Sequence, residues 1–421
     1  MAESIHLDLF PEGTQLLDDD IVVGGVSLRS IAETYGTPVF VYDETALRDR
    51  AREAAKNFDD GTAFASKSFL CGAMAQLAHD EGLCIDVATA GELDIVLRAD
   101  VPASRIILHG NNKSEAELAR AIEAGVRRIV VDSFDEIERL ASMVPADGDV
   151  ACMIRVTPGI EAHTHEFVKT GQEDTKFGFS LASGDAQRAI NALRAIPGVN
   201  FVGLHTHIGS QIYDFAAFGE TVRVLAPLVA ANGVRELCVG GGLGVAYVAG
   251  EPTITITEWA RAVREAVLEA GMDIDVLTSE PGRSIVARAG MTIYSVGTRK
   301  VAAGRNYLAV DGGMSDNPRP VLYGSGYEAV MVSKPLAERD GTFRIVGKHC
   351  ETGDFLIDAA ALPESIESGD LIVTPVTGAY GYSMASNYNR VPRPPVVFVS
   401  NGTARLVLRR ETLDDLVRLE V

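Results

Sequence analysis

The sequence is poor in cysteine and has no long apolar run. Five of its 421 residues are cysteines, and no two of them stand in a CxxC pair. Without paired spacing we expect neither a disulfide framework nor a zinc site, and the apolar surroundings of four cysteines predict core positions. No uninterrupted apolar stretch approaches the ~20 residues that span a bilayer, so we predict no membrane-spanning helix.

The charge balance argues against two further classes of partner. The net charge at pH 7 is −20, from 58 acidic and 38 basic residues spread along the chain. Such a charge repels nucleic acid and anionic membranes, so we expect neither as a partner. The first residues, MAESIHLDLFPEGT, carry neither a basic leader nor an apolar stretch. We therefore predict no secretory signal and expect a cytoplasmic protein.

Lysine is scarce as well, with eight residues against thirty arginines. One of the eight, Lys67, stands at the end of the short apolar run TAFAS and just before a helix-like window of small residues. A lysine at a strand end usually reaches into solvent. Its position alone does not show whether Lys67 is such a solvent-exposed lysine or a reactive one. The motifs elsewhere in the chain are needed to distinguish the two.

The main organisational signal is a steady alternation of short β-branched runs with amphipathic helical windows, from about residue 60 to residue 286. The runs occupy residues 62–66, 84–88, 105–109, 128–132, 151–156, 201–205, 236–240 and 275–280. One window opens at Ser114, a plausible N-cap with Glu117 three residues on, and closes at Gly125. Eight strand–helix units over this length are typical of a (β/α)8 TIM barrel, with a doubly wound open sheet as the alternative.

After residue 286 the pattern changes to strand-like segments separated by Gly, Pro and Asp turns, such as MTIYSVGTRKV and DLIVTPVTGAY. We predict a second, all-β domain, either a barrel or a sandwich, over residues 287–421. The barrel is assigned to residues 38–286. Residues 1–37 also indicate strand and turn before a helix and could belong to either part, and we group them with the β domain.

A TIM barrel builds its active site at the carboxyl ends of its strands, and polar groups gather there. The groups at seven of the eight ends are Lys67, Asp86, His109, Asp132, and the segments HTHIGSQ (205–211), GGGLG (240–244) and EPGR (280–283). A single histidine such as His205 is more often a core residue, and a triple glycine is more often a tight turn. Agreement at seven strand ends favours a site.

These groups suit a phosphorylated cofactor that reacts with an amine. Backbone N–H groups of residues 240–242 can converge on a phosphate, and the Ser210 hydroxyl can add a donor. Lys67 can form a Schiff base, as lysines do in pyridoxal phosphate enzymes. Glu280 can pair with a protonated pyridine nitrogen, and His207 offers a flat face for stacking on the ring.

Seven motifs, in this order and spacing, resemble those of the diaminopimelate decarboxylases, pyridoxal 5'-phosphate enzymes of fold type III, the alanine-racemase-like class. They are FASKSFLC, HTHIGSQ, GGGLG, SEPGRSIV, VDGGMSDNPRPVLYG, GKHCETGD and TGAYGYSMASNYN. The resemblance covers about residues 20 to 420. The chain departs from it at Ser68 and Phe64, where many relatives have Ala and Tyr. We expect this to change packing near the Schiff base and to leave the reacting groups in place.

The resemblance implies a role for each matching residue. Lys67 would carry the cofactor as a Schiff base, and His207 would stack on its ring. Further contacts to the cofactor are implied for Ser210, Gly241, Glu280, Gly282, Arg283 and Tyr380. Contacts to the substrate are implied for Arg283, Arg319, Tyr323, Glu351 and Tyr380. The arginines and Tyr323 would hold the substrate's distal carboxylate, and Glu351 its distal ammonium.

Cys350 resembles the family's proton donor, so the resemblance implies Lys67, His207 and Cys350 as the catalytic set. In relatives, Cys350 and Glu351 are supplied by the partner subunit. We therefore expect a homodimer with shared active sites.

The residue types fit meso-diaminopimelate, whose far end carries both an ammonium and a carboxylate. Arginine forks match a carboxylate and a carboxylate matches an ammonium. A substrate such as ornithine would need the acid and no arginine, and racemases of this class place arginine beside the pyridine nitrogen. We expect decarboxylation of meso-diaminopimelate to L-lysine, the last step of bacterial lysine biosynthesis.

Two alternatives remain open. One is a related decarboxylase of another amino acid, of the D-amino acid, arginine or ornithine type, against which the motif CETGD argues. The other is a non-catalytic binding protein on the same fold, against which Lys67 and Cys350 argue.

The segment HTHEFVKTGQEDTKFGFS, residues 163–180, is a candidate for a mobile lid between two barrel strands. His163 and His165 in it stand at i and i+2 with no third ligand beside them. We therefore predict a solvated loop and no metal site.

Overall fold

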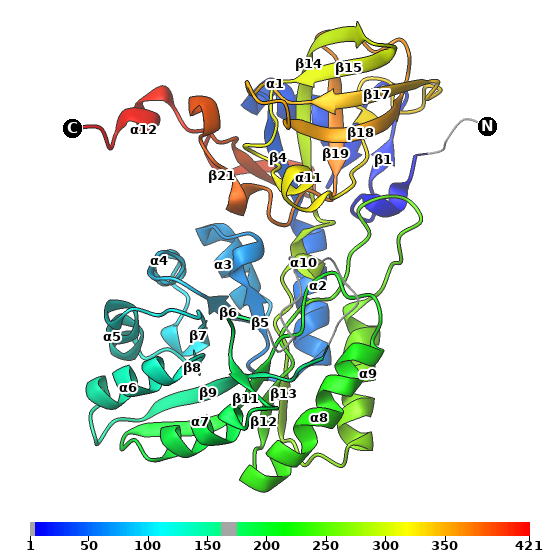
Figure 1. The fold of residues 1–421 in the computed structure, drawn as a ribbon. Coiled ribbons are helices and arrows are strands. Elements are labelled where there is room, and N and C mark those ends of the chain that lie inside the picture. Colours follow the sequence, from blue (N-terminus) through cyan, green and yellow to red (C-terminus); the bar gives the residue numbers. More distant parts are fainter. Residues whose placement is uncertain (1–4, 161–174) are drawn as a thin grey trace. The chain divides into compact units, whose positions relative to one another are not determined.

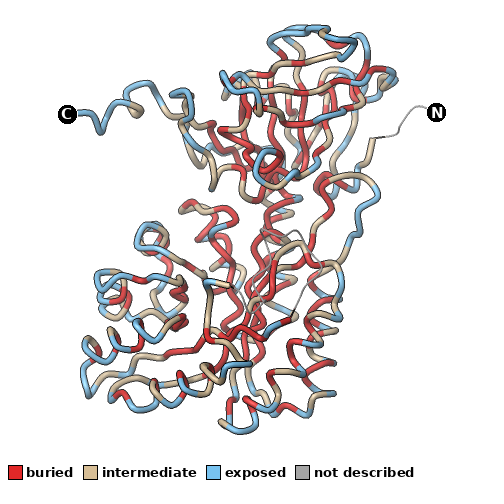
Figure 2. The backbone as a smooth tube through the Cα atoms, in the orientation of Figure 1, coloured by how far each residue is buried: buried red, intermediate tan, exposed pale blue. Residues whose placement is uncertain are grey.

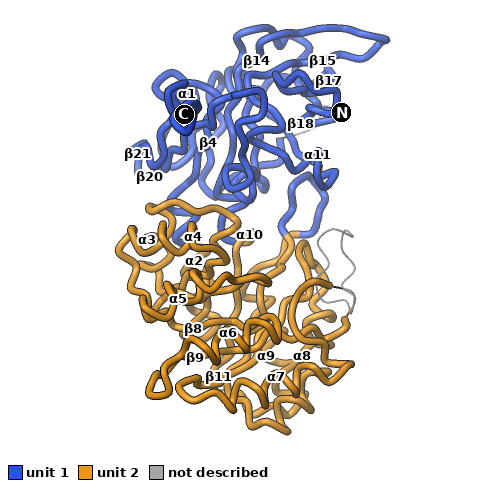
Figure 3. Tube along the Cα trace, turned by 60° about the vertical axis from the view of Figure 1, so that its left-hand side comes forward, with its two compact units in different colours: residues 1–49, 245–252, 285–421 blue, residues 50–244, 253–284 orange. Residues whose placement is uncertain are grey.

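The computed structural model describes residues 5–160 and 175–421 (Figure 1). His163, His165 and most of the predicted lid lie outside these ranges. The chain divides into two compact units, residues 1–49, 245–252 and 285–421 in unit 1 and residues 50–244 and 253–284 in unit 2 (Figure 3). Across the described ranges, no helix is both long enough and apolar enough to cross a membrane.

Unit 2 is built on eight parallel strands that pair in chain order. They are β5 (Ala63–Ala65), β6 (Cys84–Val87), β7 (Ile106–Leu108), β8 (Arg128–Val131), β9 (Val150–Thr157), β11 (Val199–Thr206), β12 (Glu236–Cys238) and β13 (Val276–Thr278). The two edges also meet, because the N–H of Ala63 donates to the carbonyl of Ser279 at 2.9 Å. Sequential order and joined edges confirm the predicted TIM barrel and exclude a doubly wound sheet, whose strand order reverses.

Helices alternate with these strands and lie outside them (Figure 1). They are α2 (Glu44–Asn57), α3 (Gly72–Asp80), α4 (Ala90–Arg98), α5 (Glu115–Ala124), α6 (Phe134–Met143), α7 (Asp185–Arg194), α8 (Ala216–Asn232) and α9 (Ile256–Glu269). The predicted caps of α5 are present: Ser114 and Glu117 form a capping box, and Gly125 ends the helix with φ 74°. A short strand, β10 (Phe179–Ser180), adds to β9.

Small and medium apolar side chains fill the barrel. Six strands contribute one residue each to a buried cluster of Ala63, Cys84, Ile107, Val130, Met153 and Cys238. The strands are mostly buried, although the first half of β11 is partly exposed (Figure 2). Cys71, Cys84, Cys152 and Cys238 are buried, as their apolar contexts predicted, and Cys350 is exposed. A packed interior leaves the strand ends as the place for polar groups.

Unit 1 is mostly sheet. Its nine-stranded sheet follows the order β18-β17-β15-β14-β4-β20-β21, and β19 and β16 extend it beside β14. The bounds are β4 (Val39–Asp43), β14 (Gly290–Ala302), β15 (Arg305–Val310), β16 (Val330–Met331), β17 (Gly341–Val346), β18 (Phe355–Leu362), β19 (Leu371–Pro375), β20 (Val396–Ser400) and β21 (Thr403–Leu408). The 13-residue β14 pairs with β4, β15 and β19 and so forms the spine of the unit.

Several short elements complete unit 1. They are the three-stranded sheet of β1 (Gln15–Leu16), β2 (Ile21–Val23) and β3 (Val26–Ser27), and the helices α1 (Leu28–Tyr35), α11 (Arg319–Tyr323) and α12 (Leu413–Val417). The N-terminal segment shares a buried core with the sheet, since Phe10, Ile21 and Leu28 pack in one cluster with Met291 and Val397.

Residues 38–49, 245–252 and 285–286 lie in unit 1, whereas the boundaries predicted from sequence assigned them to the barrel. β4 pairs antiparallel with β14 and parallel with β20, so its hydrogen bonds join it to the sheet of unit 1. A continuous buried run such as VFVYD has no period that tells one sheet from another.

Candidate active site

Lys67 follows β5 in a single tight turn, η2 (Ser66–Ser68). Its side chain is exposed, and among the described residues it makes neither a hydrogen bond nor an ion pair, which leaves the amine available. The turn is held by Ser68, whose hydroxyl donates to the carbonyl of Ala65 at 2.8 Å. A Cβ added to Gly282 would lie 3.0 Å from that hydroxyl, so a small residue there lets the two strand ends approach.

Glu280, at the end of β13, has an imidazole nitrogen close to each of its carboxylate oxygens. The Nε2 of His205 lies 2.9 Å from Oε2, and the Nε2 of His109 lies 2.9 Å from Oε1. Asp86 approaches the same nitrogen of His109, with its Oδ1 3.8 Å from Nε2. All four side chains are largely shielded from solvent, so their charges act through a low dielectric.

Burial and neighbouring charges shift the pKa values of Glu280, His205 and His109 in different directions. Burial alone would raise the pKa of Glu280, but His109 and His205 hold it well below its usual range. Burial lowers the pKa of His205 to about 4, so this ring is neutral near pH 7. Burial also opposes charge on His109, yet the carboxylates of Asp86 and Glu280 raise its pKa above the ordinary value. Glu280 is therefore ionised, and His109 is the histidine whose neighbours favour positive charge.

His207 is fixed by the glycine loop after β12. The N–H of Gly241 donates to its Nδ1 at 3.2 Å. Burial, with the charges of Lys67 and Arg155, places the pKa of His207 well below its usual range, so its ring is neutral. The N–H of Gly241, expected to be free for a phosphate, has a side-chain partner here. A Cβ at Gly241 would lie 2.2 Å from the carbonyl oxygen of Glu280, so no side chain fits.

Ser210 and Arg283 are brought together in unit 2. Arg283 begins the short helix α10 (Arg283–Val286), and its Nη2 donates to the Ser210 hydroxyl at 3.1 Å. A guanidinium and a hydroxyl in contact form a pair of donors suited to an oxyanion.

Arg319, in unit 1, is buried among aromatic side chains. Its Nε donates to the hydroxyl of Tyr327 at 3.0 Å, and its Nη2 donates to Ser325 at 2.8 Å. The guanidinium lies 4.4 Å from the ring centre of Tyr247 and 5.9 Å from that of Tyr323. The predicted pair of Arg319 and Tyr323 is thus together, and Tyr247 and Tyr327 are partners that sequence reasoning missed.

Cys350 and Glu351 are exposed in unit 1. The N–H of Cys350 donates to the side chain of Asn389 at 3.0 Å, a contact the sequence did not predict. Tyr380, the remaining predicted residue of this unit, has a left-handed backbone with φ 63°.

Asp354 joins two motifs of unit 1. Its Oδ1 accepts the N–H of Met314 at 2.7 Å, and its Oδ2 accepts the N–H of His349 at 2.8 Å. His349 also lies 2.8 Å from the hydroxyl of Ser315. A Cβ at Gly347 would lie 2.2 Å from Oδ2 of Asp354, so glycine is required where the carboxylate fits. The carboxylate thereby fixes the segment that carries Cys350 against the segment that leads to Arg319.

The predicted site residues fall into two groups. Unit 2 holds Lys67, His207, Ser210, Gly241, Glu280, Gly282 and Arg283. Unit 1 holds Arg319, Tyr323, Cys350, Glu351 and Tyr380. The contacts above join His207 to Gly241, Ser210 to Arg283, and Arg319 to Tyr323. The assembly of the two groups into one site stays a prediction.

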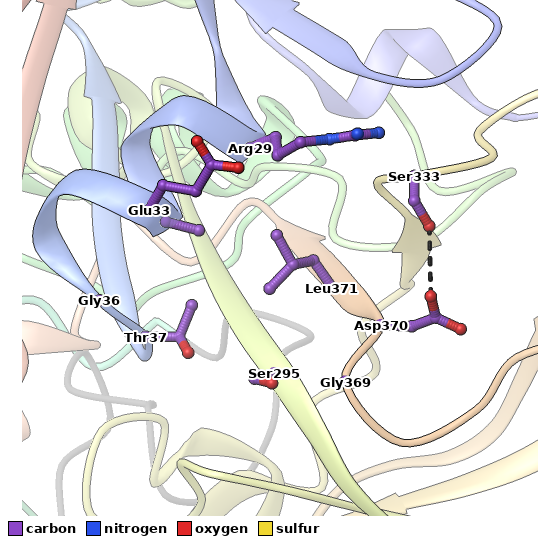
Figure 4. A pocket seen from close by; sticks show the side chains of 10 residues that line it. Arg29, Glu33, Gly36, Thr37, Ser295, Ser333, Gly369, Asp370 and Leu371 are labelled. Carbon is purple, nitrogen blue, oxygen red and sulfur yellow. Dashed lines mark hydrogen bonds between the residues drawn. The ribbon is translucent and has the colours of Figure 1, made fainter.

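A cavity of about 420 Å³ lies elsewhere in unit 1 (Figure 4). Its lining includes Arg29, Glu33, Ser295, Ser333, Asp370 and Leu371, none of which belongs to the predicted site. Asp370 already accepts bonds from the Ser333 hydroxyl and the N–H of Glu367, at 3.4 and 2.8 Å.

The donor chemistry at the strand ends of unit 2 fits pyridoxal phosphate. An available amine at Lys67 can bind the aldehyde, the ionised Glu280 can accept from a pyridinium, and Arg283 with Ser210 can bind a phosphate. An eight-stranded parallel barrel carrying these groups defines a pyridoxal phosphate enzyme of fold type III.

Comparisons with known proteins agree with this class and narrow it. Residues 44–287 match the family described as pyridoxal-dependent decarboxylase, pyridoxal binding domain. A diaminopimelate decarboxylase of Actinosynnema pretiosum is 44% identical over 99% of this chain and 96% of its own length. That of Bacillus subtilis is 45% identical over 95% and 94%. The crystal structure of diaminopimelate decarboxylase from M. jannaschii in complex with L-lysine superposes with a TM-score of 0.90 at 30% identity, over 97% of this chain and 98% of that one. The chain belongs to the diaminopimelate decarboxylases, which are pyridoxal-phosphate-dependent lyases.

Proposed function

We propose that this chain removes one carboxylate of meso-diaminopimelate, at the D centre, as CO2 and leaves L-lysine. The observation that carries the proposal is the carboxylate of Glu280, kept ionised by two histidines at the end of β13. An ionised acid there suits a reaction that needs a protonated ring nitrogen. Racemases of this class place arginine at that position.

Pyridoxal phosphate, when bound, supplies the electron sink for the electron pair that departing CO2 leaves behind. The chain's own residues prepare that chemistry. Lys67 offers its amine, Glu280 holds a proton at the pyridine nitrogen, and the neutral ring of His207 offers a flat stacking face. Ser210 and Arg283 bind on the phosphate side, together with Gly241, Gly282 and Tyr380.

The substrate side follows from charge complementarity. Arg319 and Arg283 with Tyr323 hold the distal carboxylate, and Glu351 holds the distal ammonium. Tyr380 is a further contact to the substrate. A buried guanidinium already braced by Tyr327 and Ser325 loses little freedom when it binds a carboxylate, which supports this assignment. Cys350, exposed on its loop, delivers the proton to the carbon that loses CO2.

We propose a homodimer with shared active sites, in which Cys350 and Glu351 come from the partner. An isologous dimer presents the same two patches twice and so makes two equivalent sites. A cytoplasmic location stays a prediction.

Two other functions would give different results in the assay described below. A decarboxylase of another amino acid would turn over ornithine, lysine or arginine, and a binding protein would turn over none of them. Structures of a lysine/ornithine decarboxylase from Vibrio vulnificus are only 22% identical to this chain and show a shared fold alone. Crystal structures of the M. jannaschii and Helicobacter pylori diaminopimelate decarboxylases hold L-lysine, which supports a site for the expected product in this chain.

The experiment is a parallel decarboxylation assay with purified protein and pyridoxal phosphate. Equal concentrations of meso-diaminopimelate, LL-diaminopimelate, L-lysine, L-ornithine and L-arginine are supplied, and CO2 and amine products are measured. We expect CO2 and L-lysine from meso-diaminopimelate and no turnover by a Lys67→Ala variant. Preferred turnover of ornithine, lysine or arginine would overturn the proposal, as would CO2 release that survives in Lys67→Ala.

A further inference from the structure

Glu280 is the one described carboxylate in the barrel that receives a histidine on each oxygen. The two Nε2 atoms approach at 2.9 Å from opposite oxygens, and the imidazole rings meet edge to face with centres 4.9 Å apart. His109 comes from the end of β7 and His205 from β11, so three separate strands converge on one acid. Such convergence costs desolvation of each polar group and calls for a reason.

A metal ion does not account for the cluster. Two nitrogens and a carboxylate oxygen lie near enough to one another to be considered as ligands. Tetrahedral zinc with bonds of ~2.0–2.1 Å separates its ligand atoms by about 3.3 Å. The observed 2.9 Å between each nitrogen and oxygen is instead the length of a direct contact.

The two histidines differ in environment. His205 is buried to 1% exposure, and its Nδ1 has no hydrogen-bond partner among the described residues. A neutral ring with a bare Nδ1 must carry its hydrogen on Nε2, which therefore donates to Glu280. His109 instead has two acids near one nitrogen, with Asp86 at 3.8 Å and Glu280 at 2.9 Å from its Nε2. Of the two histidines, His109 is therefore the one whose surroundings favour the cation.

Other titratable or charged groups that face the cluster are Lys67, Asp86, Glu92, Arg155, His207 and Cys238. The Sγ of Cys238 lies 3.5 Å from Oε1 of Glu280. Burial, with the charge of Glu280, raises the pKa of this thiol well above its usual range, so it stays protonated. Lys67 and Arg155 add positive charge, but His109 is the group favoured as a cation that lies within 2.9 Å of the carboxylate.

We propose that His109 and His205 are positioning residues that act through Glu280: His205 orients the carboxylate, and His109 keeps it ionised, so that the proton it shares with the cofactor stays on the pyridine nitrogen. The inference rests on the proposed function, since it takes Glu280 as the partner of that nitrogen. An ionised carboxylate has about four acceptor positions, so two histidines leave room for a third donor.

The consequence of losing His109 follows from burial. Without the adjacent cation, a shielded carboxylate favours its neutral form. The shared proton then moves from the ring nitrogen to Glu280, and the ring becomes a weaker electron sink. Each unit of change in the pKa difference between Glu280 and the ring nitrogen changes the ratio of the two proton positions about tenfold.

The direct test follows ring protonation in bound pyridoxal phosphate labelled with ¹⁵N at the pyridine nitrogen, without substrate. In the wild type we expect the resonance of a protonated nitrogen at pH 7. His109→Gln, which keeps a donor but no charge, should shift it toward the unprotonated position, and His109→Lys should return it. His205→Gln should leave the nitrogen protonated, because a neutral donor replaces a neutral donor. His79→Gln, on α3 and outside the cluster, is the matched control and should change nothing.

The kinetic counterpart is a pH profile. In the wild type Glu280 is ionised throughout the neutral pH range, so its titration causes no loss of activity on the acidic side of the pH profile. In His109→Gln the pKa of Glu280 rises, so activity should be lost as pH falls through it, and kcat at pH 6 should drop about tenfold relative to pH 8. KM should change little, since the substrate is not contacted.

A ring nitrogen that stays fully protonated in a folded His109→Gln protein, with a wild-type pH profile, would overturn the inference. If that variant does not fold, Asp86→Asn is the second test. It removes the acid that helps hold the charge on His109, so the resonance should shift in the same direction by less, and no shift would also overturn the inference. The readout needs no turnover, so a failure of the substrate assignment leaves it intact. A wild-type protein that bound no pyridoxal phosphate would contradict the proposed function itself, not only this inference.

Discussion

Asp354 offers the sharpest test of how unit 1 holds the proposed proton donor. Its carboxylate is 4% exposed and accepts the N–H groups of Met314 and His349, at 2.7 and 2.8 Å. In Asp354→Asn one oxygen becomes an amide group that faces an N–H donor. A hydrogen bond to a charged acceptor contributes about 1.5–3 kcal/mol, and a stranded donor costs more, so we expect a loss of about 2–4 kcal/mol.

Two assays test the expected loss of stability. The melting temperature of unit 1 should fall by roughly 5–15 °C. Because Cys350 directly follows His349, a shift of this segment should lower kcat/KM about 10- to 100-fold, as small misplacements of reacting groups do. Asp358→Asn is the matched control: Asp358 is an exposed acid on β18 that pairs with Arg344 at 3.2 Å, and its loss should cost under about 1 kcal/mol. An Asp354→Asn protein indistinguishable from Asp358→Asn in both assays would refute the reasoning.

Four further outcomes are expected. Borohydride reduction should attach the cofactor to Lys67, as peptide mapping would show, and label on another lysine would contradict this. Glu351→Ala should lower kcat/KM for meso-diaminopimelate about 30-fold or more, because the distal ammonium loses its partner; wild-type kinetics would refute the assignment. Lys67→Ala and Cys350→Ala homodimers, mixed under conditions that exchange subunits, should regain about a quarter of wild-type activity, since about half of the dimers carry one intact site; no regain despite exchange would mean a site within one chain. Lys113→Met should cost about 3–5 kcal/mol in a denaturant titration, because it strands Glu136, whose Oε1 lies 2.7 Å from the ammonium in a buried pair; a neutral result would contradict this.

The barrel was predictable because its strands and helices have different periods. Short β-branched runs mark each strand to within two or three residues, and the capping pair of Ser114 and Glu117 marks the start of α5. The sequence also located His109 and His205 at strand ends. It did not reveal that both contact Glu280, because that contact exists only when β7, β11 and β13 curve to one end of a closed barrel.

Other features depend on pairing that local pattern does not contain. Tyr247 lies in a loop between two barrel strands, yet it stacks on Arg319, 72 residues further on. β4 has the composition of a barrel strand and pairs with β14 and β20 instead. Both cases place a segment by long-range packing, which hydrophobic periodicity alone does not specify.

The most direct test of the central claim uses meso-diaminopimelate carrying ¹³C in the carboxylate of its D centre. We expect all of the label to leave as CO2, with unlabelled L-lysine formed in equal amount and no reaction in Lys67→Ala. Label that stays in the amino acid product, or CO2 released without L-lysine, would contradict the account.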